Sequence, residues 1–323
     1  MKEVLIVTQK SDPHTDAVIA ELKKMKCHVF RLNSESLLDF YLLNLGYDEK
    51  YNFYGFLSDK LNRKVNLKQL VAAYYRKPIT VSPHRELEID GAKDFSSLEG
   101  SIALKFLYTF PNLKWINNPF NNKQAQIKFG QLNTASKFGL RIPRTLVTND
   151  PKKAALFFKE MKNQVLCKSL QTNSVQVNQI PVHTFSHKLT KEEQENYLDN
   201  IRYTPTLIQE YIEKKTELRV NVIGNKVFAT EIYSQSLDAT KHDWRKANPW
   251  TIQHSPFQLP KRLEQSLIKF VHSYNLYFSA IDLIRTPQNE FVFIENNPNG
   301  QWYWIELQTK QPLAKSIAKL LLS

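Results

Sequence analysis

Acidic and amide side chains gather on two segments near the C-terminus that resemble neighbouring strands. Asp282 interrupts the apolar run Ala280–Ile284, and Glu295 ends the run Phe291–Ile294, with Asn297 two residues later. In a hairpin of these strands, alternation places Glu295 and Asn297 on one face. Oxygen donors on rigid strands suit Mg²⁺, which also takes water and phosphate. Solvent-facing carboxylates at strand ends would give the same pattern, so the spacing leaves both interpretations open.

Three basic residues could complete a site for a nucleotide. Lys168 ends an apolar strand, Arg219 lies in the alternating segment Glu217–Asn221, and Arg245 follows Trp244. Cations that face a triphosphate stabilise the charge that develops in phosphoryl transfer. Each of the three, taken alone, fits a solvated surface cation better, because exposed Lys and Arg are common.

A polar linker follows an apolar strand near residue 210. The strand ends in Gln209-Glu210-Tyr211-Ile212, and the linker spans Glu213–Thr216. Backbone N–H and C=O groups there could bind the edge of an adenine without any special side chain. With 8 glycines and no GxGxxG, the sequence does not predict a Gly-rich phosphate loop.

The elements that must position these residues begin with a β-α-β pattern, typical of a small parallel α/β unit. Its strand, helix and strand are predicted at Val4–Val7, His14–Lys26 and Cys27–Leu32. Further strands at Tyr51–Leu57 and Leu70–Tyr75 and a helix at Leu98–Phe110 complete the N-terminal third.

From about residue 115 the pattern changes to an α+β arrangement. Helices are predicted at Asn122–Phe138, Pro151–Met161, Pro260–Tyr274 and Leu313–Leu322. Extended segments are predicted at Ile142–Val147, Gln164–Leu170, Thr206–Ile212, Glu217–Ile223, Lys226–Ser234, Ile252–Phe257, Phe278–Ile284 and Glu290–Glu295. At about 100–200 residues per domain, the 323 residues allow two or three domains.

Composition restricts the partners and the compartment. The net charge of +13 favours acidic partners, but no run of five or six Lys and Arg occurs, so nucleic-acid binding has little support. No apolar run approaches a membrane span, and the short apolar run at Val4–Val7 does not resemble a signal sequence. Cys27 and Cys167 form no metal-spaced motif. We therefore expect a cytoplasmic protein without a membrane segment.

Read in chain order, these features resemble the ATP-grasp fold from about residue 115 to the end. Three motifs resemble more narrowly the ATP-grasp ribosomal peptide maturases, which include microviridin-type and other graspetide ligases and the ligases of grasp-with-spasm systems. The motifs are Tyr75-Arg76-Lys77-Pro78, Asp243-Trp244-Arg245 and Asn297-Pro298-Asn299-Gly300-Gln301-Trp302. They extend the resemblance over nearly the whole chain.

The resemblance implies an N-terminal pre-ATP-grasp α/β domain at residues 1–114, a central ATP-grasp subdomain at 115–205 and a C-terminal one at 206–323. It also implies that ATP is clamped between two antiparallel sheets. The implied nucleotide contacts are phosphate binding by Lys128 and Lys168, adenine binding by the Gln209-Glu210-Tyr211-Ile212 segment, and ribose binding by Glu217. Residues 169–174 contain no glycine, so phosphate cover must come from elsewhere than the usual Gly-rich flap.

The resemblance further implies that Asp282, Glu295 and Asn297 bind Mg²⁺. Arg219 and Arg245 are the implied catalytic residues, which steady the phosphate and an acyl phosphate. The expected reaction uses ATP and Mg²⁺ to join Glu or Asp side chains of an acidic precursor peptide, carrying a leader segment, to Thr, Ser or Lys. The products are macrocyclic esters or amides, and such enzymes are often homodimers.

Two alternatives stay open at this level. One is an ATP-grasp ligase for a small amino acid or carboxylic acid, similar to glutathione synthetase. The other is a basic nucleic-acid-binding protein that has lost catalysis. The presence of Asp282, Glu295, Asn297 and Lys168 argues against it. Trp302 and Trp304 could line an acceptor site, but packing is the stronger expectation because indoles bury a large area.

Overall fold

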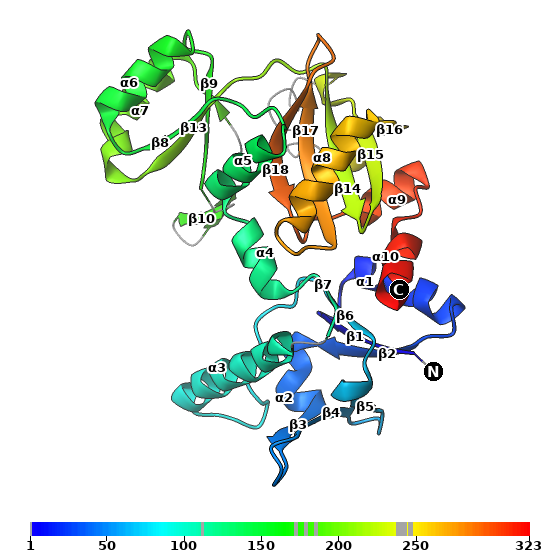
Figure 1. The fold of residues 1–323 in the computed structure, drawn as a ribbon. Helices are drawn as coiled ribbons and strands as arrows, with labels where there is room; N and C mark the ends of the chain where they lie inside the picture. The colour runs from blue at the N-terminus through cyan, green and yellow to red at the C-terminus, as the bar shows by residue number, and fades with distance from the viewer. Residues whose placement is uncertain are drawn as a thin grey trace.

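The computed structural model describes residues 2–110, 113–170, 174–177, 180–183, 187–236, 244 and 248–323. Figure 1 shows an N-terminal unit, a central unit and a C-terminal unit, drawn in blue to cyan, green, and yellow to red. The two later units lie together on one side of the N-terminal unit. The chain end returns to the N-terminal unit, where α10 lies beside α1.

A parallel sheet with the strand order β2-β1-β6-β7 forms the base of the N-terminal unit. Val4–Val7 in β1 is fully buried, as expected for a parallel strand covered on both faces. The predicted β-α-β opening is therefore confirmed. Its elements are β1 (Glu3–Thr8), α1 (Pro13–Lys24), β2 (His28–Asn33), β6 (Ala72–Tyr75), α3 (Asp90–Phe106) and β7 (Trp115–Ile116).

A small antiparallel sheet, β3-β4-β5, is inserted between β2 and β6. Its elements are β3 (Tyr41–Tyr47), β4 (Phe53–Asp59) and β5 (Lys64–Asn66), preceded by the one-turn helix α2 (Leu37–Phe40). Only β4 was predicted. The helix α3 begins at Asp90, well before the predicted start at Leu98, because its first turns are polar and show no periodic apolar signal.

The central unit is an antiparallel sheet with two helices packed against one face. Ala154, Phe157 and Phe158 of α6 bury their side chains against this sheet. The sheet has the order β12-β9-β13-β8, and a separate hairpin pairs β10 with β11. The bounds are β8 (Thr145–Thr148), α6 (Pro151–Glu160), β9 (Val165–Lys168), β10 (Ser174–Val177), β11 (Ile180–His183), β12 (His187–Lys188), α7 (Lys191–Asn200) and β13 (Thr206–Glu210).

The prediction of one helix over Asn122–Phe138 is wrong. The segment forms α4 (Pro119–Ala125) and α5 (Lys128–Lys137), and Ile127 between them is extended. The Gln131 amide donates to Ala125 O at 2.7 Å, so a side chain satisfies a carbonyl that the break leaves without a helical partner.

The C-terminal unit is a five-stranded antiparallel sheet, β16-β15-β14-β17-β18. One face packs against α8, which buries Leu267 and Phe270. The bounds are β14 (Thr216–Ile223), β15 (Lys226–Ile232), β16 (His254–Phe257), α8 (Lys261–His272), β17 (Phe278–Arg285), β18 (Phe291–Asn297), α9 (Tyr303–Thr309) and α10 (Leu313–Leu322).

One hydrophobic core joins the N-terminal sheet to the end of the chain. Val18 and Leu22 of α1, Trp302, and Ile317 of α10 are all completely buried in this core. Packing is therefore confirmed as the role of Trp302. Within the described residues, none of the helices is long and apolar enough to cross a bilayer.

Candidate active site

A row of charged side chains crosses three neighbouring strands of the C-terminal sheet. Arg219 on β14 is directly opposite Asp282 on β17, which is directly opposite Glu295 on β18. Directly paired residues of antiparallel strands project to the same face. The register therefore brings an arginine and two carboxylates together, although Arg219 is 63 positions before Asp282 and Glu295 is 13 positions after it.

Asp282 is held on both sides by charged or polar neighbours. Arg219 Nη1 donates to its Oδ1 at 2.8 Å and to its Oδ2 at 2.9 Å. Asn297 Nδ2 donates to Oδ2 at 3.1 Å. Both of its oxygens therefore accept hydrogen bonds, and the bonds from the guanidinium are charge-assisted. The orientation of the Asp282 carboxylate is thus fixed before any ligand binds.

The donor set fits a hard cation. Asp282 and Glu295 supply carboxylate oxygens, and Asn297 supplies an amide oxygen once its nitrogen is bonded to Asp282. Across the described ranges, no three residues of the types His, Cys, Asp or Glu cluster as metal ligands. Two carboxylates and an amide suit Mg²⁺, which prefers oxygen and keeps several positions for water and phosphate.

A β-bulge adds an apolar residue to this face. Asp282 is paired with Glu295 but Leu283 is paired with Phe293, so Ile294 is the extra residue on β18. Ile294 and Glu295, although consecutive, both line the cleft described next. Simple alternation, as applied to the sequence, could not predict this.

A cleft lies between the central and C-terminal sheets. Its walls combine apolar side chains with most of the predicted nucleotide and metal residues. It is lined by Pro143, Leu166, Lys168, Gln209, Glu210, Ile212, Lys214, Glu217, Trp244, Asp282, Ile284, Ile294 and Glu295. The structure therefore brings together seven of the predicted residues, namely Lys168, Gln209, Glu210, Ile212, Glu217, Asp282 and Glu295.

The linker after β13 is anchored at its start. Glu210 N–H donates to Arg144 O at 2.9 Å, and Tyr211 N–H donates to Gln164 O at 2.9 Å. In the described part of the chain, the N–H of Ile212 makes no backbone hydrogen bond. Ile212 also lines the cleft, so the linker borders the space where an adenine contact was expected, and that contact stays a prediction.

Lys214 was not predicted as a site residue, and it lines the cleft beside Glu217. Lys214 Nζ lies 3.0 Å from Glu217 Oε1, and both side chains are largely buried, with 6% and 14% of their surface exposed. The Ser234 hydroxyl donates to the same oxygen at 3.0 Å. The sequence does show a Lys and a Glu three positions apart in the linker, and this spacing could have indicated that the two side chains pair.

Two of the predicted residues that the structure describes, Lys128 and Tyr211, line neither the cleft nor the hollow described next. Lys128 Nζ donates to Ser169 O at 2.9 Å, which places it beside the end of β9. The ring of Tyr211 packs under the Lys188 ammonium, 4.2 Å from the ring centroid. Arg245 lies outside the described residues, so its predicted role stays a prediction.

An open hollow of about 950 Å³, here called the outer hollow, adjoins the cleft at Trp244. It receives the two remaining predicted residues, Arg219 and Asn297. It is lined by Gln9, Tyr75, Lys77, Pro78, Ile79, Gln126, Arg219, Trp244, Trp250, Asn297, Pro298, Asn299, Gly300, Gln301 and Trp304. The Trp304 ring also packs 5.3 Å from that of Trp244, which agrees with the expected packing role, and its acceptor role stays a prediction.

Side chains from outside the C-terminal sheet hold the loop after β18. Arg76 Nη1 donates to Asn299 O at 2.7 Å and to its Oδ1 at 2.9 Å. Asn117 Nδ2 donates to Pro298 O at 2.8 Å. Trp302 N–H donates to His14 Nε2 at 3.2 Å. The wall of the outer hollow is therefore fixed by the N-terminal unit.

Burial and neighbouring charges shift the pKa values of His14 and Asp12, which lie behind this loop. Burial lowers the pKa of His14, which agrees with a neutral ring that accepts from Trp302 N–H. Burial acts to raise the pKa of Asp12, but the hydrogen bond to His14 and the charge of Arg76 outweigh it and lower that pKa. Asp12 is thus an anion that neutralises the buried Arg76.

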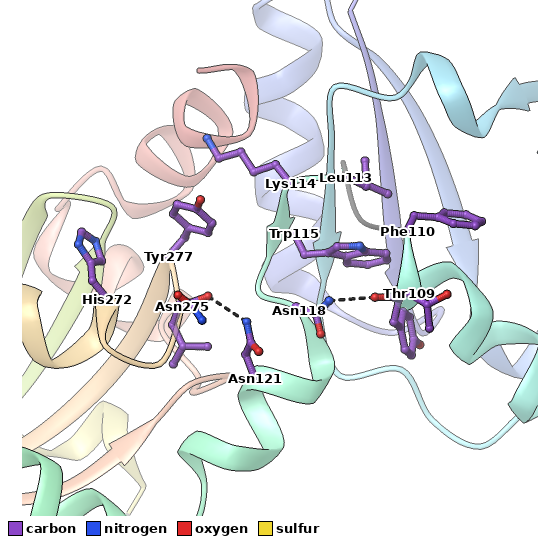
Figure 2. A pocket seen from close by; sticks show the side chains of 12 residues that line it. Thr109, Phe110, Leu113, Lys114, Trp115, Asn118, Asn121, His272, Asn275 and Tyr277 are labelled. Carbon is purple, nitrogen blue, oxygen red and sulfur yellow. Dashed lines mark hydrogen bonds between the residues drawn. The ribbon is translucent and has the colours of Figure 1, made fainter. Parts of the chain in front are cut away.

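A separate cavity of about 640 Å³ lies away from these sites, between the N-terminal unit and the end of α8. Figure 2 shows Lys114, Trp115 and Tyr277 on its walls, with Asn121 donating to Asn275 O at 3.2 Å. Lys114 Nζ donates to Leu320 O at 2.8 Å, so its charge is used in holding the chain end. None of the predicted site residues that the structure describes lines this cavity.

Sequence comparisons place the C-terminal two thirds of the chain in a known family. Residues 125–321 match the family described as RimK-like ATP-grasp domain. The alpha-aminoadipate–LysW ligase LysX of Sulfurisphaera tokodaii is 22% identical over 197 residues, which is 58% of this chain. This match spans 65% of the length of that relative.

Three solved structures are similar over nearly their whole length. A Chryseobacterium gregarium RiPP-associated ATP-grasp ligase, in complex with ADP and a leader and core peptide, has a TM-score of 0.91 at 28% identity, covering 100% of this chain and 97% of that one. The macrocyclase MdnC of Microcystis aeruginosa MRC, bound with precursor peptide MdnA, has a TM-score of 0.84 at 26% identity and covers 99% of each. MdnB of the same organism has a TM-score of 0.78 at 27% identity, covering 100% and 99%.

These similarities confirm the predicted α+β ATP-grasp fold and the predicted resemblance to peptide-modifying ligases. The two facing sheets, with a cleft between them, lie within the matched residues. Because the match covers well over half of the chain, this protein belongs to the RimK-like ATP-grasp family and is a ligase.

Proposed function

We propose that this ligase uses ATP and Mg²⁺ to activate Glu or Asp side chains of a ribosomal precursor peptide and joins them to Thr, Ser or Lys. One observation carries the proposal. The Arg219–Asp282–Glu295 row lies where the nucleotide cleft adjoins a cationic outer hollow. A carboxylate in the outer hollow would meet a γ-phosphate in the cleft at this row.

In this proposal the cleft holds ATP through the residues that line it. The Ile212 linker and the apolar Ile284 and Ile294 would hold adenine, and Glu217 would bind the ribose. Lys168 would contact the phosphates. Lys128, bonded to Ser169 O, would reach them only after that bond breaks. Mg²⁺, when bound, supplies charge neutralisation between the phosphates and the incoming carboxylate.

The residues of the row would position Mg²⁺ and orient the reacting groups. Asp282, Glu295 and Asn297 would hold the cation. Arg219 would orient the carboxylate, because Arg219 Nη1 is fixed by Asp282 and its Nε has no partner among the described residues. Arg245 is proposed to assist at the acyl phosphate.

The chemistry proceeds in two balanced steps. A carboxylate oxygen attacks the γ-phosphorus, the bond from that phosphorus to the β–γ bridging oxygen breaks, and ADP leaves with the electron pair. The acceptor hydroxyl or amine then attacks the carbonyl carbon, the carbon–oxygen bond to phosphate breaks, and the proton of the acceptor goes to the released phosphate. Bringing both groups into one site accounts for much of the expected acceleration.

Charge supports an acidic peptide as the substrate. The chain carries a net charge of +13, and the described residues that line the outer hollow include Lys77 and Arg219 but no Asp or Glu. The solved structures most relevant here are described as holding leader, core or precursor peptides. The buried free thiols of Cys27 and Cys167 suit a reducing compartment such as the cytoplasm.

A homodimer is proposed because helix α3 exposes an apolar stripe. Phe95, Leu98, Ile102 and Phe106 recur at helical spacing and are 66%, 61%, 37% and 52% exposed. Such a contiguous stripe on a surface helix is typical of a protein interface. A second copy of the chain is the occupant that the family resemblance implies.

A small amino acid or carboxylic acid is the second candidate substrate, favoured by the similarity to LysX. Intact mass spectrometry separates the two. A candidate precursor encoded beside the gene is incubated with the enzyme, ATP and Mg²⁺. Loss of one water per linkage, only with ATP, supports the peptide proposal. An unchanged peptide, with ATP consumed on free amino acids, supports the second candidate.

A further inference from the structure

The ammonium group of Lys77 lines the outer hollow without a partner of its own. It makes no ion pair or hydrogen bond with any residue that the structure describes. The Arg219 guanidinium lines the same hollow, and its charge acts on Lys77. A cation beside a reaction site that is bonded to no described residue is available to a ligand.

The backbone at Lys77 is held in an uncommon conformation. Its φ of +42° lies in the left-handed region, which side chains other than Gly, Asn and Asp rarely adopt. The preceding Arg76 is 2% exposed and bonded to Asn299, and Pro78 follows. Strain of this kind persists where neighbours fix the chain and often marks a functional residue. In this conformation Lys77 lines the hollow.

The hollow is electropositive around Lys77. Loss of solvation lowers the pKa of its ammonium, and the charges of Arg76 and Arg219 act in the same direction, against Asp12. Aromatic rings complete the walls, from Tyr75 and from the tryptophans of the opposite side. Such a site suits a side chain that has apolar methylenes and ends in an anion.

We propose that Lys77 binds the side-chain carboxylate of the acidic peptide in the outer hollow and thereby selects Glu or Asp for activation beside Arg219. The inference rests on the proposed function and names a residue that determines its specificity. A phosphate of ATP is the other anion that Lys77 could meet. Lys77 lines the outer hollow and not the cleft, which favours the carboxylate.

The test compares binding of two fluorescent synthetic peptides, one of alternating Thr and Glu and one with Gln for each Glu, in the presence of Mg-ADP. Anisotropy titrations use the full-length wild type, Lys77→Met and Lys77→Arg. The matched control is Lys261→Met, which removes the same charge from an exposed position on α8. Mg-ADP affinity is measured by calorimetry for every protein, which also reports folding.

We expect the wild type to prefer the Glu peptide by about tenfold to a hundredfold, the range for a hydrogen bond to a charged group. Lys77→Met should lose this preference, while Lys77→Arg and Lys261→Met keep it and all four proteins bind Mg-ADP alike. An unchanged preference in Lys77→Met, or no preference in the wild type, would overturn the inference. A parallel loss of Mg-ADP affinity in Lys77→Met would also overturn it, in favour of a phosphate contact.

The same proteins separate this inference from the proposed function. Lys77 could prove to govern the Glu preference while the precursor gains no linkage with ATP. The proposed ligation of a peptide would then be wrong, and the binding role of Lys77 would stand. If Lys77→Met forms linkages with wild-type selectivity, the binding role fails and the ligation stands.

Discussion

At the residue scale, Glu295 gives the most specific test of the proposed cation site, because it is one of the two carboxylates that would bind the cation. Glu295→Gln keeps the shape but removes the charge, so turnover should fall by about 100-fold to 1000-fold, or ~3–4 kcal/mol. The melting temperature should stay the same, because Glu295 makes no ion pair with a described residue. Steady-state release of ADP and thermal unfolding check this prediction.

Glu290→Gln is the control, since Glu290 is exposed and pairs with Arg141 at the other end of β18. It should turn over at the wild-type rate. Equal activity of the two variants would remove Glu295 from the cation site.

His14 makes stability depend on pH. Its pKa is lower in the folded protein than the usual 6.5, so the unfolded chain takes up the proton first as the pH falls. The free energy of unfolding should therefore decrease between about pH 7.5 and pH 5.5. Asp12, whose pKa is also lowered, adds a loss of the same sign below its usual 3.8.

Urea unfolding at both pH values, for the wild type and His14→Gln, measures this contribution. The variant should lose part of the pH dependence. The remainder should come from His254, which is partly buried and whose pKa burial also lowers. A variant with the full wild-type dependence would show that His14 does not supply it.

At the element scale, the loop after β18 depends on the close approach of Gly300 to β17. A Cβ at Gly300 would lie 2.6 Å from the Cβ of Ala280 and 3.1 Å from that of Asn297. Gly300→Ala should cost about 1–3 kcal/mol of unfolding free energy and lower turnover, because the loop must shift Asn297.

Gly91→Ala is the matched control, since nothing lies within 4 Å of a Cβ there and the site is in α3. It should stabilise the protein by about 0.5–1 kcal/mol and leave turnover unchanged. Urea unfolding and initial rates measure both effects. A neutral Gly300→Ala would show that the loop tolerates displacement.

The sequence predicted those elements whose burial follows a simple period. Asp282 and Glu295 stood out because each interrupts or ends an apolar strand, and the strand register then placed them opposite each other. The bulge at Ile294 and the break at Ile127 could not be predicted, because each is stabilised by contacts distant in the sequence. Gln131, for example, bonds both Ala125 O and Asn296 O.

At the scale of the whole molecule, the outer hollow was beyond reach of sequence analysis. Arg76 and Asn299 meet across 223 positions, and only the folded arrangement shows that Lys77 faces the same space as Arg219. The motif that contains Lys77 could be recognised by its resemblance to a family, but the sequence did not show where Lys77 lies in the folded chain. More of the cleft between the two sheets was within reach, because several residues that line it stand at the ends of apolar strands that the sequence shows.

The stripe on α3 predicts how two copies would associate. Leu98→Asp places a charge in the centre of this stripe and should convert a dimer into a monomer, because an unpaired charge in an apolar interface is strongly unfavourable. Leu156→Asp, at an exposed site on α6, should leave the dimer intact. Light scattering after gel filtration gives the mass of each protein. A monomeric wild type would contradict the prediction.

The central claim is that a peptide carboxylate takes the γ-phosphate of ATP. The most direct test labels the side-chain carboxylates of the candidate precursor with ¹⁸O and analyses the released phosphate by mass spectrometry. Activation as an acyl phosphate predicts that one ¹⁸O passes into inorganic phosphate for each linkage formed. Linkages that form while the released phosphate stays unlabelled would contradict the account.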